Sequence, residues 1–194
     1  MRGDAIVRAM SEARILRGGI VGAGRSRNGL GPFLARHFEA AGGEVIGVAG
    51  RDQDRAADAG AFLANQLGHP LASYSTIGGL LEQHLDVLIV ASPVPAHLPT
   101  LRAVCGSGIA VLCEKPLGMP DESDAVATVL AEFLAQDQLL MENCQWPEAL
   151  PAWRELFPGR AGDPIREVAM GLSPSAADGM LEDSLSHLIS VVQA

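Results

Sequence analysis

Lys115 is the residue of this sequence best suited to exchange a proton with a bound substrate. It is the single lysine among 14 basic residues, and the other 13 are arginine. An arginine side chain stays protonated at every accessible pH, whereas a lysine amine can lose its proton when it is buried. The composition therefore indicates that position 115 requires an amine, unless one lysine has persisted by chance in an arginine-rich sequence.

Asp183 and His187 form a second candidate pair. On a helix, residues four positions apart share a face, so the carboxylate could hold the imidazole in one tautomer while the other ring nitrogen serves a substrate. The same spacing occurs in solvated pairs on helix surfaces, and both interpretations stay open. His37, His69 and His84 lack acidic or cysteine partners at metal-ligand spacing. No metal site is predicted.

A glycine-rich segment, GAGRSRNGLGP at positions 22–32, follows the first predicted strand. Glycines at this place let the chain turn tightly and let a pyrophosphate approach the N-terminus of the next helix, where unpaired N–H groups favour anions. We predict that Gly22, Gly24, Arg25 and Ser26 bind a dinucleotide, the alternative being a purely structural turn. Because Arg27 occupies the third glycine position of the GxGxxG pattern, we expect a longer loop than usual.

The end of the second predicted strand carries Gly50, Arg51 and Asp52. An acidic residue at this place holds the adenosine ribose in NAD enzymes, whereas an arginine accommodates a 2′-phosphate. Gly50 leaves space and Arg51 offers a guanidinium, so we predict NADP as the cofactor. NAD is the alternative, with Asp52 on the ribose and Arg51 solvated.

Two loops at strand ends carry further candidate cofactor contacts. Ser92, Pro93 and His97 leave the predicted central strand, and Glu114 and Lys115 follow the next strand. Ligands of open α/β sheets bind at the carboxyl ends of the strands, so Lys115 is expected to face the cleft. His97 could hydrogen-bond cofactor or substrate, and a helix-capping or surface histidine is an equally open interpretation.

The elements that must position these residues alternate between strand and helix. Apolar runs predict six strands, at 15–21, 44–49, 71–74, 86–92, 110–113 and 139–141. Helical spacing predicts helices at 32–42, 54–67, 98–106 and 121–136, the first with Pro32 at its N1 position, and a helix or loop at 79–84. The unbroken apolar run within 86–92 is typical of a strand covered on both faces, so it should lie at the centre of the sheet. The pattern predicts an α/β fold with a doubly wound parallel sheet.

A domain boundary is predicted near position 145, because prolines become frequent from Pro147 onward. Residues 1–145 would form a dinucleotide-binding domain, and residues 146–194 a partial α/β sheet domain with a strand at 166–172 and a helix at 179–194. A length of 194 residues allows one full domain and part of a second.

The overall composition excludes several classes of partner. With 14 basic and 23 acidic residues the formal charge is −9, so nucleic acids and anionic lipid surfaces would be repelled. The 3 cysteines fit neither a disulfide framework nor a metal clip, and no aliphatic run approaches the ~18 residues that a membrane span needs. We expect a soluble, cytoplasmic protein.

Four motifs together resemble the glucose-fructose oxidoreductase, inositol dehydrogenase and rhizopine-catabolism (Gfo/Idh/MocA) family, over about residues 14–194. They are the GxG turn at Gly22 and Gly24, the Ser-Pro-x-x-x-His segment ending at His97, the tripeptide Glu114-Lys115-Pro116, and the helical pair Asp183 and His187. The resemblance implies an N-terminal Rossmann domain that binds NAD(P) and a C-terminal sheet domain that receives substrate and often mediates oligomerisation. It also implies that Lys115 and His187 act on the substrate oxygen or nitrogen with help from Asp183, and that segment 114–116 borders the nicotinamide.

The predicted function is hydride transfer between a nicotinamide cofactor and a small hydroxyl, carbonyl or imine substrate, such as a sugar or polyol. Members of this family continue beyond the apolar run 188–194 in which the sequence ends, so we expect a C-terminally truncated chain with an incomplete substrate wall. A homo-oligomer is expected from the apolar surface that an incomplete sheet would expose. The alternatives are a non-catalytic dinucleotide-binding module, acting as a sensor or partner subunit, and a Rossmann-type fold that binds a different nucleotide.

Overall fold

The computed structural model of the protein describes residues 14–24, 29–144, 146–160, 163, 167, 169, 187 and 189–191. The strands are β1 (Arg17–Val21), β2 (Glu44–Ala49), β3 (Ala72–Tyr74), β4 (Val87–Val90), β5 (Ala110–Glu114) and β6 (Leu140–Asn143). The α-helices are α2 (Leu30–Ala40), α3 (Gln53–Leu67), α4 (Ile77–Leu81), α5 (His97–Val104), α6 (Ser123–Ala135) and α7 (Ala149–Leu156). Short 3-10 helices are η2 (Val94–Ala96), η3 (Pro120–Glu122), η4 (Trp146–Glu148) and η5 (Pro158–Arg160).

The strands form one 6-stranded sheet in the order β3-β2-β1-β4-β5-β6, and every neighbouring pair is parallel. The chain builds outward from β1 in one direction to β3, and then returns to the other side of β1 with β4. The carboxyl ends of β1 and β4 therefore form the switch point at which doubly wound sheets bind ligands. The predicted parallel sheet and the central place of the strand within 86–92 are confirmed.

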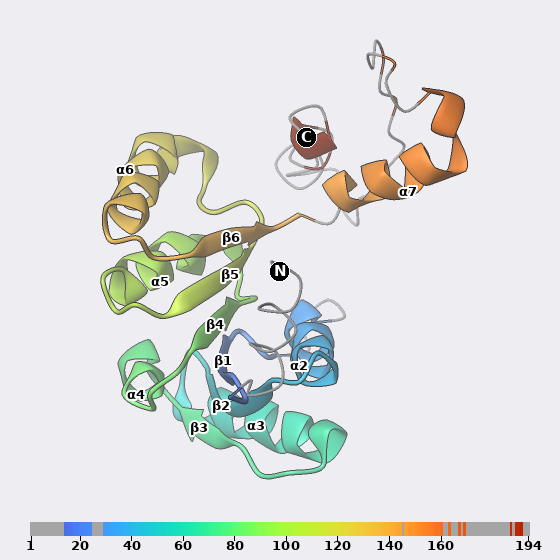
Figure 1. Cartoon of the computed structure of the whole chain (residues 1–194). Coiled ribbons are helices and arrows are strands. Elements are labelled where there is room, and N and C mark those ends of the chain that lie inside the picture. The colour runs from blue at the N-terminus through green and yellow to red at the C-terminus, as the bar shows by residue number, and fades with distance from the viewer. Residues whose placement is uncertain are drawn as a thin grey trace.

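Helices cover both faces of the sheet (Figure 1), with α2 and α3 on one side and α4, α5 and α6 on the other. Each face has its own apolar core. On the α2 and α3 side, Ala35 and Leu63 pack against Ile20, Val48 and Ile89. On the opposite side, the core is formed by residues of α4, α5, α6 and the strands, including Leu80, Leu101, Phe133, Leu88 and Val111. Successive residues of a strand alternate between the two cores, which explains the unbroken apolar run of β4.

Local signals in the sequence explain where the helices begin and end. Asp52 caps α3, because its carboxylate accepts a hydrogen bond from the N–H of Arg55 at 2.8 Å. Gly68 ends the same helix in the left-handed conformation, with φ 84°. Helix α2 begins two residues before Pro32, so this proline is not at N1 as predicted. It still lies in the first turn, where a missing N–H breaks no intrahelical bond.

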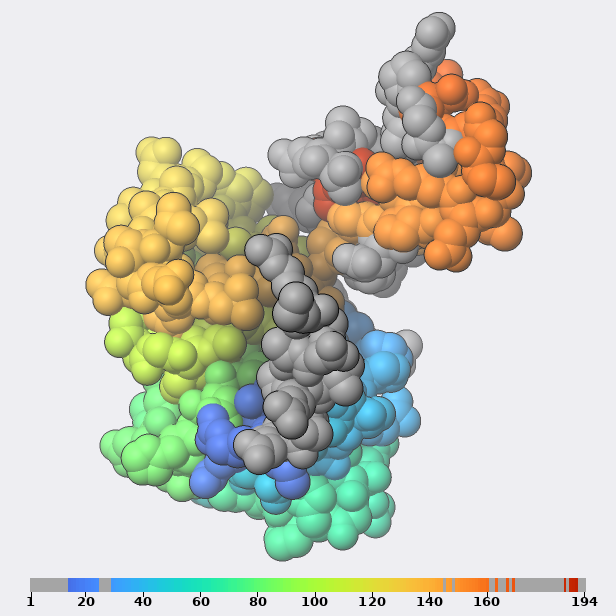
Figure 2. Space-filling model, viewed as in Figure 1, coloured from blue at the N-terminus to red at the C-terminus, as the bar shows by residue number. Residues whose placement is uncertain are grey.

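The chain leaves the sheet after β6 and continues into η4 and α7. Helix α7 lies beyond the carboxyl end of β6 (Figure 1) and stands out from the body that the sheet and its helices form (Figure 2). The predicted strand at 166–172 lies almost entirely outside the described residues. Of the predicted helix at 179–194, the described residues His187 and 189–191 are helical.

Candidate active site

The turn after β1 packs backbone to backbone against the loop after β4. Gly22 has φ 88°, and its N–H donates to the carbonyl oxygen of Ala49 at 3.2 Å. A Cβ atom on Gly22 would stand 2.4 Å from both N and Cα of Ser92. Only glycine fits at this position, because it tolerates the positive φ and has no side chain to clash. The glycine turn is thus fixed at the switch point of the sheet.

The glycine turn also leaves space for a ligand and lies close to α2. Gly24 is exposed, and a Cβ atom on it would have no neighbour within 4 Å. A Cβ atom on Gly31, by contrast, would stand 2.9 Å from Cα of Ala23 and from the carbonyl oxygen of Gly22. The third glycine of GxGxxG allows this close packing of helix against strand. Gly31 therefore has the packing role that the pattern assigns to position 27. Sequence reasoning missed Gly31, and Arg25 and Ser26 lie outside the described residues.

Two guanidinium groups, those of Arg51 and Arg55, lie at the end of β2. The carboxylate of Asp52 caps α3 and also lies 3.8 Å from Nε of Arg51 and 3.5 Å from Nε of Arg55. Both arginine side chains are largely exposed, at 75% and 67%. Asp52 is therefore already engaged by the helix and by two guanidinium groups. Arg55 was not singled out in the sequence, although its position one turn into α3 beside Asp52 could have suggested it.

The loop after β4 is held by His97, the first residue of α5. Its ring is 1% exposed, so the surface interpretation of this histidine is wrong. Nε2 lies 2.6 Å from the carbonyl oxygen of Ser92, and Nδ1 lies 2.8 Å from the carbonyl oxygen of Pro116. Pro93 precedes η2. The hydroxyl oxygen of Ser92 is buried and has no hydrogen-bond partner among the described residues.

Lys115 follows β5, and its charge acts on two acidic groups, Glu114 and Glu142. Glu114 is 8% exposed and accepts a hydrogen bond from the side-chain amide of Asn143, at the end of β6. Burial raises the pKa of the Glu114 carboxyl, while the Asn143 hydrogen bond and the charges of Lys115 and His97 act in the opposite direction. Burial also raises the pKa of Glu142, and the charge of Lys115 opposes this shift. Lys115 is thus close enough to both carboxylates to influence their charge, and Glu142 and Asn143 are residues that sequence reasoning missed.

His187 lies beside the segment of the chain that follows β6. Its imidazole meets the indole of Trp146 edge-on, with 5.9 Å between the ring centroids. One helical turn further, the hydroxyl of Ser190 donates to the carbonyl oxygen of His187 at 2.8 Å and accepts from the thiol of Cys144 at 3.0 Å. These contacts place His187 beside the segment that follows β6, the strand that pairs with β5. Asp183 lies outside the described residues.

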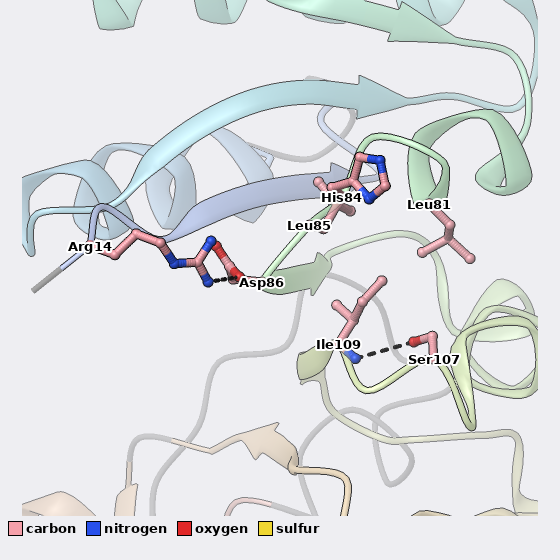
Figure 3. A pocket seen from close by; sticks show the side chains of 7 residues that line it. All are labelled: Arg14, Leu81, His84, Leu85, Asp86, Ser107 and Ile109. Carbon is pink, nitrogen blue, oxygen red and sulfur yellow. Dashed lines mark hydrogen bonds and ion pairs between the residues drawn. The ribbon is translucent and has the colours of Figure 1, made fainter.

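An open pocket of about 320 Å³ lies at the opposite edge of the sheet (Figure 3). It is lined by residues at the amino ends of the strands, among them Arg14, His84, Asp86, Ser107 and Ile109. Arg14 and Asp86 form an ion pair within it. Ligands of parallel α/β sheets bind at the carboxyl ends, so this pocket is not the candidate site.

Two wider features of the described residues bear on function. No three His, Cys, Asp or Glu side chains among them gather in a way that could hold a metal ion. In the same part of the chain, no helix combines the length and apolar character needed to cross a membrane.

His69 does have an acidic partner, because its Nε2 lies 2.7 Å from the carboxylate of Glu39. This pair was not predicted, because the two residues lie far apart in the sequence.

The carboxyl edge of the sheet fits a dinucleotide. The turn at Gly22 and Gly24 offers open space before a helix whose first turn has no acidic residue, which favours a pyrophosphate. The buried hydroxyl of Ser92 lies at the switch point, where it lacks the hydrogen bond that a ligand could provide. A sequence model of the Gfo/Idh/MocA oxidoreductases, described as a family with an NAD-binding Rossmann fold, matches residues 16–142. The chain belongs to the Gfo/Idh/MocA family.

Individual relatives agree with this family membership. The chain is 31% identical over 141 residues to trans-1,2-dihydrobenzene-1,2-diol dehydrogenase of Mus musculus, covering 73% of this chain and 40% of that protein. It is 30% identical over 182 residues to inositol 2-dehydrogenase 4 of Saccharopolyspora erythraea, covering 90% of this chain and 52% of that one. The Gfo/Idh/MocA chain described here thus spans about half the length of these relatives, or less.

Two solved structures of oxidoreductases share the fold of this Gfo/Idh/MocA chain. An oxidoreductase from Agrobacterium radiobacter, solved in complex with NAD+, L-tartaric acid and magnesium, matches with a TM-score of 0.70 at 16% identity, covering 93% of this chain and 54% of that one. An NAD-binding oxidoreductase from Klebsiella pneumoniae matches with a TM-score of 0.69 at 22% identity, covering 92% and 52%. At these identities the likeness concerns the fold alone.

Proposed function

We propose that this chain is the cofactor-binding part of an NAD(P)-dependent dehydrogenase or reductase. The observation that carries the proposal is that the turn at Gly22 and Gly24 and the lysine at position 115 occupy one edge of the sheet, on the two sides of the loop that follows β4. A bound nicotinamide cofactor supplies a hydride donor or acceptor. The protein then has to bind it, orient the substrate and handle one proton.

Lys115 would handle the proton at the substrate oxygen or nitrogen. Lys115 acts electrostatically on the carboxyl groups of Glu114 and Glu142. An ammonium can donate a hydrogen bond or a proton to a developing alkoxide. His187, oriented by Asp183, would act as general acid or base, a role typically worth ~10²- to 10⁴-fold in rate. The contact with Trp146 supports this role, because it brings His187 to the end of β6.

The cofactor is proposed to be NADP. Arg51 and Arg55 both flank the end of β2, and the carboxylate of Asp52 caps α3. Two exposed guanidinium groups suit a 2′-phosphate better than a neutral ribose hydroxyl. The dissociation constants of NADPH and NADH compare the two cofactors directly, and a preference of about tenfold or more for NADH contradicts this assignment.

The substrate class is proposed to be a small hydroxyl compound or the corresponding carbonyl or imine. The names of the relatives support this class, since they are dehydrogenases of a cyclic diol and of inositol. Residues 146–194 would contribute to the substrate side as part of a second, sheet-containing domain, separate from a dinucleotide-binding domain at 1–145. A non-catalytic dinucleotide-binding module is the alternative that the substrate panel tests.

A titration followed by a substrate panel tests the proposal. All four coenzyme forms are added while melting temperature and tryptophan emission are recorded, and then oxidation or reduction of polyols, sugars and cyclic imines is measured. Binding without turnover supports the non-catalytic module, and no binding of any form contradicts both. Lys115→Arg keeps the charge but removes ready proton exchange, so turnover should fall by about 10²-fold or more. Arg102→Lys, on the exposed side of α5, is the matched control.

A homo-oligomer in the cytoplasm is the proposed form of the protein. Large apolar side chains are exposed on and beside α6, with Leu134 at 82% and Leu139 at 64%. Apolar surface of this kind is typical of contacts between subunits. The cysteines Cys105, Cys113 and Cys144 are free thiols, as in a reducing compartment. Light scattering after size-exclusion chromatography measures the oligomeric state, and a monomer at all concentrations contradicts it.

A further inference from the structure

His97 connects two loops at the candidate active site. It is 1% exposed, and both of its ring nitrogens face backbone carbonyl oxygens. Nε2 lies 2.6 Å from the oxygen of Ser92, in the loop after β4, and Nδ1 lies 2.8 Å from the oxygen of Pro116, in the loop after β5. Neither nitrogen is left to contact a cofactor or a substrate. The ring instead links two segments that belong to different strands.

In either tautomer the ring donates to one of the two carbonyl oxygens, because each of its nitrogens faces an acceptor. A carbonyl oxygen only accepts hydrogen bonds, and a neutral imidazole has one N–H donor. Glu114 and Glu142 lie within electrostatic reach of this ring, and Lys115 acts on the same two carboxyl groups.

The linked carbonyl groups adjoin both parts of the site. Pro116 directly follows Lys115, so the hydrogen bond to its oxygen restrains the backbone that carries the lysine. Ser92 is the residue against which Gly22 packs, at 2.4 Å from a Cβ position. A shift of either loop would therefore displace the other, because the buried ring of His97 contacts both.

We propose that His97 is a positioning residue which, through the contacts of its two ring nitrogens with Ser92 and Pro116, holds Lys115 in a fixed place relative to the dinucleotide turn. It would act through Lys115 and not by touching the cofactor. This inference rests on the proposed role of Lys115 in proton handling, and it separates two interpretations of His97, cofactor contact and support of the lysine.

The single lysine of the chain provides a direct test that needs no activity. Protein labelled with ¹⁵N and ¹³C only in lysine gives one side-chain amine signal, which reports the surroundings of Lys115. The proposal expects this signal to move in His97→Leu, which removes both ring contacts, and to move less in His97→Gln, which keeps a side-chain amide donor. The control is His37→Gln, which removes a ring contact of 2.9 Å to the carbonyl oxygen of Phe33 on α2. An unmoved Lys115 signal in a folded His97 variant overturns the proposal.

The hydrogen bonding of the ring is measured in the unaltered protein. The chain has 5 histidines, and the signals that vanish in His97→Gln identify those of His97. A ring N–H proton of His97 that exchanges slowly with solvent supports a buried hydrogen bond to Ser92 or Pro116. Exchange as fast as that of the exposed His37 overturns the proposal. This measurement decides the matter even if His97→Leu fails to fold.

Kinetics then distinguish positioning from cofactor binding. Displacement of Lys115 should lower kcat by about 10²-fold, while the cofactor dissociation constant stays unchanged. A rise of about tenfold in that constant with kcat retained makes His97 a cofactor ligand and overturns the proposal. If the unaltered protein turns over no substrate, the proposed catalytic function fails, and the Lys115 signal still reports whether His97 holds the lysine.

Discussion

Gly31 packs directly against the backbone of Ala23, so closely that a Cβ atom on Gly31 would stand 2.9 Å from Cα of Ala23. This contact joins the first turn of α2 to the turn that follows β1. It means that the helix N-terminus points at the space beside Gly24, where a Cβ atom would meet no neighbour within 4 Å. Gly31, in the first turn of α2, therefore has a packing role. Gly24, in the turn after β1, leaves room for a ligand.

Alanine at these two glycines should separate the two roles. Gly31→Ala should destabilise the fold by about 1–3 kcal/mol, because the helix has to move away from the β1 turn. Gly24→Ala should leave the free energy of unfolding nearly unchanged and weaken dinucleotide binding, because its methyl group fills the open space. Urea unfolding and cofactor titration measure both quantities. Equal losses of stability in the two variants contradict this assignment.

Replacing Arg51 and Arg55 together by serine should change cofactor preference. If the two guanidinium groups bind a 2′-phosphate, the NADPH dissociation constant should rise by about tenfold or more, since a charge-assisted hydrogen bond is worth ~1.5–3 kcal/mol. Binding of NADH should hardly change. Arg36→Ser, on the exposed side of α2, controls for the loss of positive charge. If the binding of NADPH and of NADH weakens equally, the arginines act only through the overall electrostatic field of the protein and not on a 2′-phosphate.

Gln138 should be important for stability. It is 7% exposed, and its amide accepts from the N–H of Gly106 at 2.7 Å and donates to the carbonyl oxygens of Ile109 at 2.7 Å and Val104 at 3.1 Å. Gln138→Met keeps the size but leaves these buried groups unpaired, so it should cost about 2–4 kcal/mol in urea unfolding. Gln66→Met, exposed on α3, should cost little. A cost below that of the control would show that water replaces the lost bonds.

Asp86 should contribute stability that disappears in acid. Its carboxylate accepts a hydrogen bond from the N–H of Arg17 at 2.8 Å and pairs with Arg14, and these partners lower its pKa in the folded protein. A lowered folded-state pKa means that the stabilisation is present above the unfolded value of 3.8 and is lost as pH falls through the folded value.

The comparison of Asp86→Asn with the unaltered protein tests this linkage. At neutral pH the variant should be less stable by about 1 kcal/mol, and the difference should shrink as the pH is lowered below 3.8. Asp58→Asn, exposed on α3, is the control. A difference that stays constant down to acid pH would argue against the linkage.

Cys113 should resist thiol reagents in the folded protein. Burial raises the pKa of its thiol to about 12, and the charges of Glu114 and Glu142 act in the same direction. The reactive thiolate is therefore scarce at neutral pH. Cys105 and Cys144 are only half-buried, so they should be alkylated first. Mass spectrometry after brief iodoacetamide treatment follows each cysteine, and early labelling of Cys113 would count against its burial.

Much of the fold could be predicted because its signals are local. The unbroken apolar run of β4 indicates a strand covered on both faces, and the spacing of apolar residues in α3 and α6 indicates helices. The glycine turn after β1 could be recognised because a strand precedes it and a helix follows it. Lys115 could be singled out by composition alone, as the one lysine among 14 basic residues.

Tertiary structure decided the features that depend on segments distant in the sequence. Gly31 could not be recognised as the packing glycine from its spacing, because only the approach of α2 to the β1 turn defines that role. The burial of His97 between Ser92 and Pro116, and the contact of Asn143 with Glu114, likewise arise only when neighbouring strands pair. Periodicity along the chain records which residues face inward, but hydrogen bonds between loops depend on how the strands are ordered in space.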